Sequence, residues 1–175
     1  MAPQAVTDTS TNAPLSQTIG HIAHVVAADG FPTGERARLK RWSPGSPPSL
    51  AFYRFAFQHL PDRWEHQPET WLTLVTGLAL MCPTPHRRDL SVGRALAETG
   101  YAEARLERLL AARGNALPTL VLRAARFLRA KNASCNWTDF AYLLGLAGSP
   151  EKVRLRIARN YYRHQLERVP SDGKE

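Results

Sequence analysis

The sequence predicts an all-α protein: a single compact helical-bundle domain of about eight or nine helices joined by short loops. Apolar residues recur every three or four positions along most of the chain, which is the period of a helix that buries one face. Proline and glycine interrupt this pattern at short intervals, and no run alternates as a strand would. With 175 residues, 43% of them hydrophobic, the chain can bury a substantial core.

Two helices are expected near the N-terminus. Residues 15–29 carry an apolar stripe at helical spacing, and Gly30 ends that helix. The stripe consists of Leu15, Ile19, Ile22, Ala23 and Val26. A short basic helix then covers residues 34–42, with Thr33 as its N-cap.

The next two helices are predicted to supply much of the core. Ser46 is expected to cap the first of them, with Pro47 at its first position and Pro61 at its end. Residues 68–82 are apolar on nearly all sides, which predicts a central, buried helix.

Five helices are expected in the C-terminal half. The first three cover residues 91–98, 102–113 and 118–131. Asn136 is positioned to cap the fourth, and Asp139 stands three residues later, as in a capping box. Ser149 is expected to cap the last helix, with Pro150 at its first position, and this helix should run to about Arg168.

The chain is expected to consist of one helical domain over residues 15–168. Residues 1–14 form a predicted flexible tail, and residues 169–175 a predicted loose C-terminal tail. The longest apolar run, residues 71–82, is too short to cross a bilayer, and no signal peptide is visible. We therefore expect a cytoplasmic protein without a membrane partner.

Positive charge is the main indicator of function. The formal net charge is +8, and residues 104–166 hold twelve Lys and Arg against three acidic residues, a local net charge of +9. Such a concentration predicts a polyanionic partner: nucleic acid first, an anionic membrane second.

Three predicted helices carry basic faces. In the last helix, spacings of four, three and four residues align Lys152, Arg156, Arg159 and Arg163. The helix over residues 118–131 carries, opposite its apolar arc and without a nearby acidic residue, Arg123, Arg126 and Arg129. The short basic helix carries Arg36, Arg38, Lys40 and Arg41.

Apolar residues are expected to flank the basic stripe of the last helix on both sides. One flank consists of Val153, Ile157 and Tyr161, and the other of Leu155, Tyr162 and Leu166. The core would then hold this helix by both flanks and leave its basic edge exposed.

A single basic helix face is more often a solvated surface than a binding site, but three in one chain favour polyanion binding. Contacts to phosphate carry no sequence information. The sequence contains no homeodomain, zinc-finger or strand-borne aromatic pattern, so nucleic-acid binding without base specificity is expected.

Nothing comparable indicates catalysis, a metal or another cofactor. No Cys/His, Ser/His/Asp or glycine-rich phosphate-loop pattern is present. His21 and His24 lack further ligands at a suitable spacing. Cys82 and Cys135 lie far apart without a CxxC pattern, which predicts two buried free thiols.

Five short segments follow one another in an order and spacing that resemble a known family. They are GERARLKR at residues 34–41, AFYR at 51–54, SVGRAL at 91–96, LRAARFL at 122–128, and Asn136-Trp137 followed by VR at 153–154 and ARNYY at 158–162. In these segments the chain resembles the CasB family, the small subunit of the type I-E CRISPR surveillance complex Cascade.

This resemblance implies an all-helical, non-catalytic subunit without a cofactor. Copies would stack head-to-tail beside the backbone and large subunits and the guide RNA. They would help to hold target DNA opened into an R-loop, including the displaced non-target strand. The resemblance matches basic residues of the family to Arg36, Lys40, Arg41, Arg54, Arg105, Arg123 and Arg126.

Two alternatives stay open from the sequence. One is a free-standing protein that binds single-stranded nucleic acid, which should bind DNA or RNA tightly without partners. The other is a structural adaptor whose basic faces contact acidic protein, which should show no nucleic-acid footprint.

Overall fold

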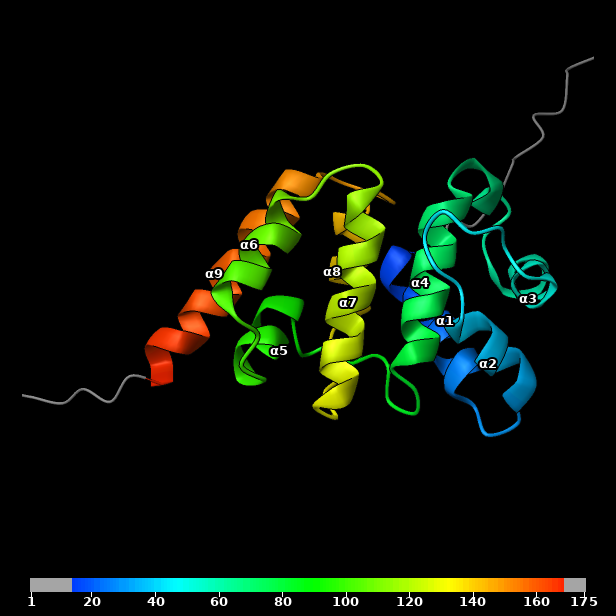
Figure 1. Cartoon of the computed structure of the whole chain (residues 1–175), viewed down its shortest axis with the longest axis horizontal. Coiled ribbons are helices and arrows are strands. Elements are labelled where there is room, and N and C mark those ends of the chain that lie inside the picture. Colours follow the sequence, from blue (N-terminus) through cyan, green and yellow to red (C-terminus); the bar gives the residue numbers. More distant parts are fainter. Residues whose placement is uncertain (1–13, 169–175) are drawn as a thin grey trace, which may run out of the picture.

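The computed structural model describes residues 14–168, and this part of the chain forms nine α-helices and one 3₁₀ turn without a named strand (Figure 1). The elements are α1 (Leu15–Ala27), α2 (Thr33–Lys40), α3 (Leu50–His59), η1 (Trp64–His66), α4 (Pro68–Leu80), α5 (Val92–Glu98), α6 (Glu103–Ala111), α7 (Ala116–Ala130), α8 (Trp137–Leu143) and α9 (Pro150–Arg168). The all-α prediction is confirmed. The two predicted tails lie outside the described residues, apart from Pro14.

Helix α4 is surrounded by other helices, because α7, α2, α1 and α8 all pack against it (Figure 1). All of its residues from 71 to 79 are buried, including the hydroxyl-bearing Thr73 and Thr76. A helix can bury its whole circumference only when neighbours surround it, so the prediction of a central helix from its all-round apolar sequence is confirmed.

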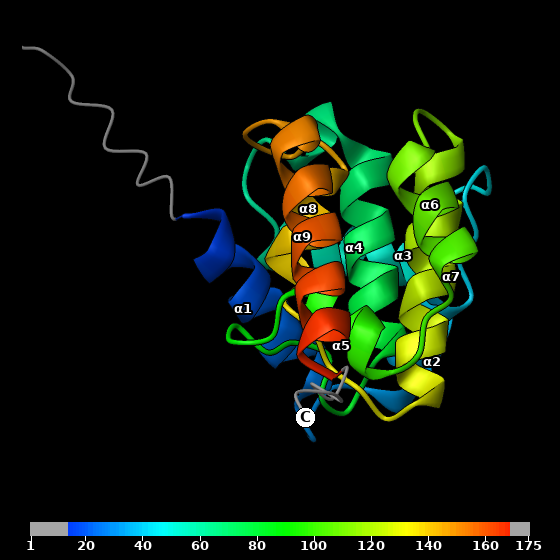
Figure 2. The same ribbon diagram turned by 90° about the vertical axis from the view of Figure 1, so that its left-hand side faces the viewer.

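The C-terminal half packs around α9. This helix lies along α5 and also contacts α8, while α6 and α7 form a neighbouring pair (Figure 2). A Cβ added at Gly93 of α5 would lie 2.1 Å from the backbone oxygen of Ile157 in α9. The two helices therefore approach so closely that no larger residue than glycine fits at this position.

The predicted start of the third helix is wrong. Helix α3 begins at Leu50, and the Oγ of Ser49, not Ser46, accepts a hydrogen bond from Phe52 N at 3.2 Å. Pro47 is followed by a second proline, which disfavours helical backbone at Pro47. The Trp42 indole also donates a hydrogen bond to Ser46 O at 2.9 Å. Residue 46 thus belongs to the preceding turn.

One predicted cap and one predicted capping box are absent from the structure. Thr33 is the first residue of α2 and not its N-cap, which is Pro32. Asn136 caps α8 as predicted, because its Oδ1 accepts from Thr138 N at 3.0 Å. However, Asp139 does not complete a capping box. Its carboxylate accepts hydrogen bonds from Val92 N at 3.0 Å and from Arg156 Nη2 at 2.6 Å, and it thereby joins α8 to α5 and α9.

Only one apolar flank of α9 is covered. Val153, Ile157 and Tyr161 are buried, whereas Leu155, Tyr162 and Leu166 are 60%, 45% and 74% exposed. At ~100° per residue, the two sets lie on nearly opposite sides of the helix. One side packs on the bundle, and the other faces outward. The expectation that the core holds α9 by both flanks is therefore wrong.

The close contact between Gly77 and Trp137 leads to a stability prediction. A Cβ at Gly77 would lie 2.0 Å from the Trp137 ring, which is fully buried. We expect Gly77→Ala to lower the free energy of unfolding by about 2–3 kcal/mol through overpacking, as measured by urea denaturation.

Gly34→Ala is the matched control, because a Cβ at Gly34 has no heavy atom within 4 Å. This helical substitution should leave the free energy of unfolding unchanged or raise it by up to about 1 kcal/mol. Equal effects of the two substitutions would contradict the packing argument.

Candidate nucleic-acid interface

The predicted basic face of α7 is present. Arg123, Arg126 and Arg129 are exposed, while Val121, Leu122, Ala124, Ala125 and Leu128 are buried on the other side of the helix. Within residues 14–168, none of these three arginines forms an ion pair; Arg129 donates to the Asn132 side chain at 3.0 Å. Their charges are therefore available to a ligand.

Helix α7 lies between α6 on one side and α4 and α2 on the other (Figure 1), and both α2 and α6 carry further cations. Burial raises the pKa of the Cys82 thiol, and the charges of Arg36, Lys40 and Arg129 act in the opposite direction. Cations of both α2 and α7 therefore lie near Cys82. Burial likewise raises the pKa of Tyr101, and Arg105 of α6 and Arg123 of α7 oppose it.

We call this surface the basic band and define it by Lys40, Arg105, Arg123, Arg126 and Arg129; the predicted site residues Arg38 and Arg41, at the end of α2, are also exposed. It also contains an aromatic side chain. Phe127 is half-buried, with Arg105 at 6.0 Å and Lys131 at 5.8 Å from the centre of its ring. The band can therefore offer several guanidinium groups to a polyanion, and one half-buried aromatic ring lies among them.

Three of the predicted site residues are engaged within the fold. Arg36 donates from Nε to Val26 O at 2.9 Å and from Nη2 to Ala28 O at 2.8 Å, so it satisfies carbonyls at the end of α1. Arg54 forms an ion pair with Glu35. Arg156 bonds to the buried Asp139 carboxylate.

Arg154 plays a similar internal role, which we did not predict from the sequence. It is buried and donates from Nε to Leu110 O at 2.9 Å and from Nη2 to Ala112 O at 2.7 Å, at the end of α6. Burial, assisted by Arg113, lowers its pKa. The helical period offered a signal, since Arg154 shares the side of α9 that Ile157 and Tyr161 bury.

The predicted basic stripe of α9 is divided between two surroundings. Arg156 and Arg163 line a polar hollow of about 510 Å³ between α5, α8 and α9, while Arg159 lies beside the exposed Tyr162 and Leu166. We call this hollow the groove. Its lining includes Arg88, Thr138, Asp139, Arg156, Asn160, Arg163 and His164. Lys152 is exposed and does not line the groove.

Sequence reasoning missed most of the groove because its residues come from three separate stretches of chain. Arg88 stands in the loop before α5, Thr138 belongs to α8, and Asn160 belongs to α9. No local spacing connects them. Arg156 is held in the groove by two contacts: its ion pair with Asp139, and its position 5.8 Å from the centre of the Tyr142 ring.

The remaining polar side chains are mostly structural. Burial and the Arg88 charge lower the pKa of His86, whose Nδ1 accepts a hydrogen bond from Trp137 N at 3.1 Å. Cys82 and Cys135 are buried free thiols, as predicted. No group of three His, Cys, Asp or Glu side chains able to hold a metal occurs in the part of the chain that the structure describes. Its helices also include none that is both long and apolar enough for a membrane span.

The fold and these surfaces define a class: a helical protein with an arginine-rich face and a separate arginine-lined groove. Comparison of the sequence with family models then identifies the family, because residues 35–162 match that of the CRISPR-associated protein Cse2. The chain belongs to this family, the CasB small subunit of type I-E Cascade. The resemblance in the five segments is thereby confirmed.

Two solved structures contain chains of similar fold. One is described as the crystal structure of E. coli Cascade bound to a PAM-containing dsDNA target; the match has 21% sequence identity and a TM-score of 0.63, and covers 83% of this chain and 95% of that one. The other is described as a CRISPR RNA-guided surveillance complex, with 19% identity, a TM-score of 0.65, and coverage of 89% and 98%. At these identities the likeness shows the fold. No curated protein sequence matches the chain.

The Asp139 contacts lead to a second stability prediction. We expect Asp139→Asn to lower the free energy of unfolding by about 1–3 kcal/mol, because the amide keeps the volume but removes the charge that Arg156 requires. Chemical denaturation checks this. Asp89→Asn is the control, since Asp89 pairs with Arg87 at the exposed surface and its loss should leave stability unchanged.

Proposed function

We propose that this chain is a non-catalytic subunit that stabilises the R-loop of an RNA-guided surveillance complex in antiviral defence. It would hold the opened DNA, including the displaced non-target strand, through phosphate contacts that do not depend on base sequence. Its partners would be the backbone and large subunits, the guide RNA and the target DNA. The basic band is the observation that carries this proposal, together with membership of the family.

The physical argument rests on the small energy balance of an R-loop. The heteroduplex that forms is about as stable as the DNA duplex it replaces, so a few contacts to the displaced strand decide whether the loop persists. Arg123 and Arg129 are six residues apart on α7, a rise of about 9 Å, which allows the face of this one helix to contact more than one phosphate. Cations of α2 and α6 lengthen that path.

The decisive experiment is target-DNA binding by the guide-loaded complex, reconstituted with and without this chain. Two substrates are compared, one with the non-target strand and one without it. We expect omission of the chain to speed the loss of opened DNA, mainly when the displaced strand is present. If the complex holds both substrates equally well without the chain, the proposal fails and an adaptor role is favoured.

The basic band gives a prediction about salt. In the reconstituted complex, Arg123→Ala with Arg126→Ala should shorten target-DNA retention and reduce the slope of log K against log salt by about 1.4, since each single-strand phosphate contact accounts for about 0.7. Binding titrations over a range of salt concentrations measure this slope.

The matched control removes the same charge elsewhere. Arg63→Ala with Arg113→Ala alters two exposed arginines outside both the band and the groove and should leave the slope as it is in the unaltered protein. A folded band variant with an unchanged slope would show that Arg123 and Arg126 are only solvated.

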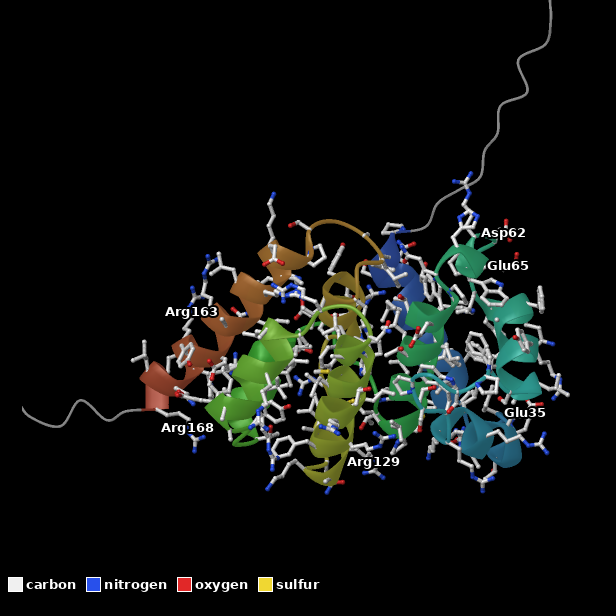
Figure 3. All side chains as sticks on the ribbon, turned by 45° about the horizontal axis from the view of Figure 1, so that its top comes forward. Glu35, Asp62, Glu65, Arg129, Arg163 and Arg168 are labelled. Atoms are coloured by element: carbon white, nitrogen blue, oxygen red, sulfur yellow. The ribbon has the colours of Figure 1, made fainter. Side chains whose placement is uncertain are left out.

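Self-association of copies, head to tail, is part of the same proposal. Two exposed apolar stripes support it: Leu50, Tyr53 and Phe57 on α3, and Leu155, Tyr162 and Leu166 on α9. The two helices lie at opposite ends of the molecule (Figure 1). Asp62 and Glu65 stand at the α3 end, and Arg163 and Arg168 at the α9 end (Figure 3). Two different apolar surfaces at opposite ends favour a heterologous contact, because an isologous contact would pair like with like.

Mixing two variants tests the direction of this contact. Phe57→Asp and Leu166→Asp should each abolish self-association of copies in the assembled complex. A mixture of the two should restore one contact, because each variant retains the surface that the other lacks. Native mass spectrometry of the complex counts the copies. If Leu166→Asp alone has no effect, or if mixing restores nothing, the contact is not head-to-tail.

The two alternatives make different demands on the structure. A free-standing single-strand binding protein would bind DNA or RNA tightly through the band without other subunits, which a titration of the isolated chain measures. One surface of α9 fits the adaptor alternative. Arg159 lies there among Tyr162 and Leu166, and apolar neighbours suit a protein partner better than a phosphate.

A further inference from the structure

The groove between α5, α8 and α9 contains polar groups that the fold itself leaves without partners. Thr138 is only 7% exposed and lines the groove, yet its Oγ1 has no hydrogen-bond partner within residues 14–168. The Nδ1 of His164 is also buried and lacks a partner among the described residues, and His164 lines the same groove. Buried polar groups are almost always satisfied, so two at one site indicate that something else bonds to them.

Positive charge exceeds negative charge in the lining of the groove, which holds Arg88, Arg94, Arg156 and Arg163 against Asp89, Asp139 and Glu167. Its acidic residue Asp139 is occupied by Val92 N and Arg156, and Asp89 is occupied by Arg87. Arg88, Arg163 and Glu167 form no ion pair within residues 14–168, so the unpaired charges of the groove are two positive and one negative. A ligand that fits this site therefore carries negative charge as well as hydrogen-bonding groups.

The volume also limits the ligand. At about 510 Å³ the groove lies within the range of sites that hold a small organic molecule, and it is far larger than one phosphate group requires. Tyr142 adds an aromatic surface to the lining, and Asn160 adds an amide that can bond to a planar ring edge.

We propose that the groove binds one nucleotide of the displaced DNA strand. Arg88 and Arg163 would bind its phosphate, and Thr138, Asn160 and His164 would bond to its base or sugar. This inference rests on the proposed function and extends it. The basic band holds a strand at any position along its length, whereas a nucleotide seated in the groove sets where the strand lies on the subunit.

Photocrosslinking in the reconstituted complex tests the site. The displaced strand carries 5-iododeoxyuridine at one position at a time, and crosslinked peptides are identified by mass spectrometry. We expect a crosslink to the peptide containing Tyr142 or to that containing His164. Thr138→Val with Asn160→Ala, which changes no charge, should lower the yield of this crosslink roughly three- to tenfold, the equivalent of losing one or two hydrogen bonds.

The band variant Arg123→Ala with Arg126→Ala serves as the matched comparison. It should weaken retention while the crosslinks that remain still map to the groove. Amide exchange of α8 and α9, measured with and without the displaced strand, should show protection only when the strand is present. Protection without that strand would mean that a protein segment occupies the groove, which overturns the inference.

A separate titration tests whether the groove binds a free nucleotide outside the complex. Thymidine 5′-monophosphate is titrated into the full-length chain and followed by amide chemical shifts. Shifts confined to residues around Thr138 and Asn160 support the nucleotide chemistry; no shifts there, together with no groove crosslink, overturn it.

The proposed function has its own point of failure. Crosslinks at the band alone, with normal retention of target DNA, would remove the groove site and leave R-loop stabilisation standing. If the displaced strand crosslinks neither to the band nor to the groove, and omission of the chain does not change retention of target DNA, the proposed function itself is contradicted.

Discussion

The packing of Trp137 against Gly77 is the contact on which the rest of the arrangement depends. The indole lies on the central helix at the one position without a side chain, donates from Nε1 to Met81 Sδ at 3.3 Å, and is fully buried. Because Trp137 begins α8, this contact fixes the helix that carries Asp139 two residues later. The Asp139 carboxylate then holds α5 and α9. Three helices of the groove are thus placed by one aromatic ring and one carboxylate.

Arginine has two different uses in this chain, and the formal net charge does not separate them. Arg36 and Arg154 each donate to two backbone carbonyls at the end of a neighbouring helix, which suits the fixed fork of a guanidinium. These helix ends would otherwise leave carbonyl groups unsatisfied. The arginines of α7 have no such task within the described residues and remain exposed. A charge count therefore overstates the surface that can meet a polyanion, and contacts decide which cations belong to it.

Local periodicity predicted the features that a single helix determines. The all-α class, the burial of α4 and the basic face of α7 follow from which residues share a side of one helix. Features that need two helices were missed or misread. The spacing of Asn136 and Asp139 is the same for a capping box and for a buried ion pair, and only packing distinguishes them. Likewise, α9 has two apolar sides, and its sequence does not say which one the bundle covers. The groove depends on Arg88, Thr138 and Asn160, which are brought together only by the fold.

The two sides of α9 connect protein association to strand binding. One edge of this helix supplies Arg156 and Arg163 to the groove, and the outward side carries Leu155, Tyr162 and Leu166. A partner that covers the outward side would shield Tyr162 and bring a low-dielectric surface close to Arg163, where electrostatic attraction to a phosphate is less screened by water. Contact between subunits and contact with a strand would then strengthen each other through a single rigid helix, without any change of shape. In that arrangement successive copies would present their grooves at a fixed repeat, and the displaced strand would gain its retention from several weak sites held in register.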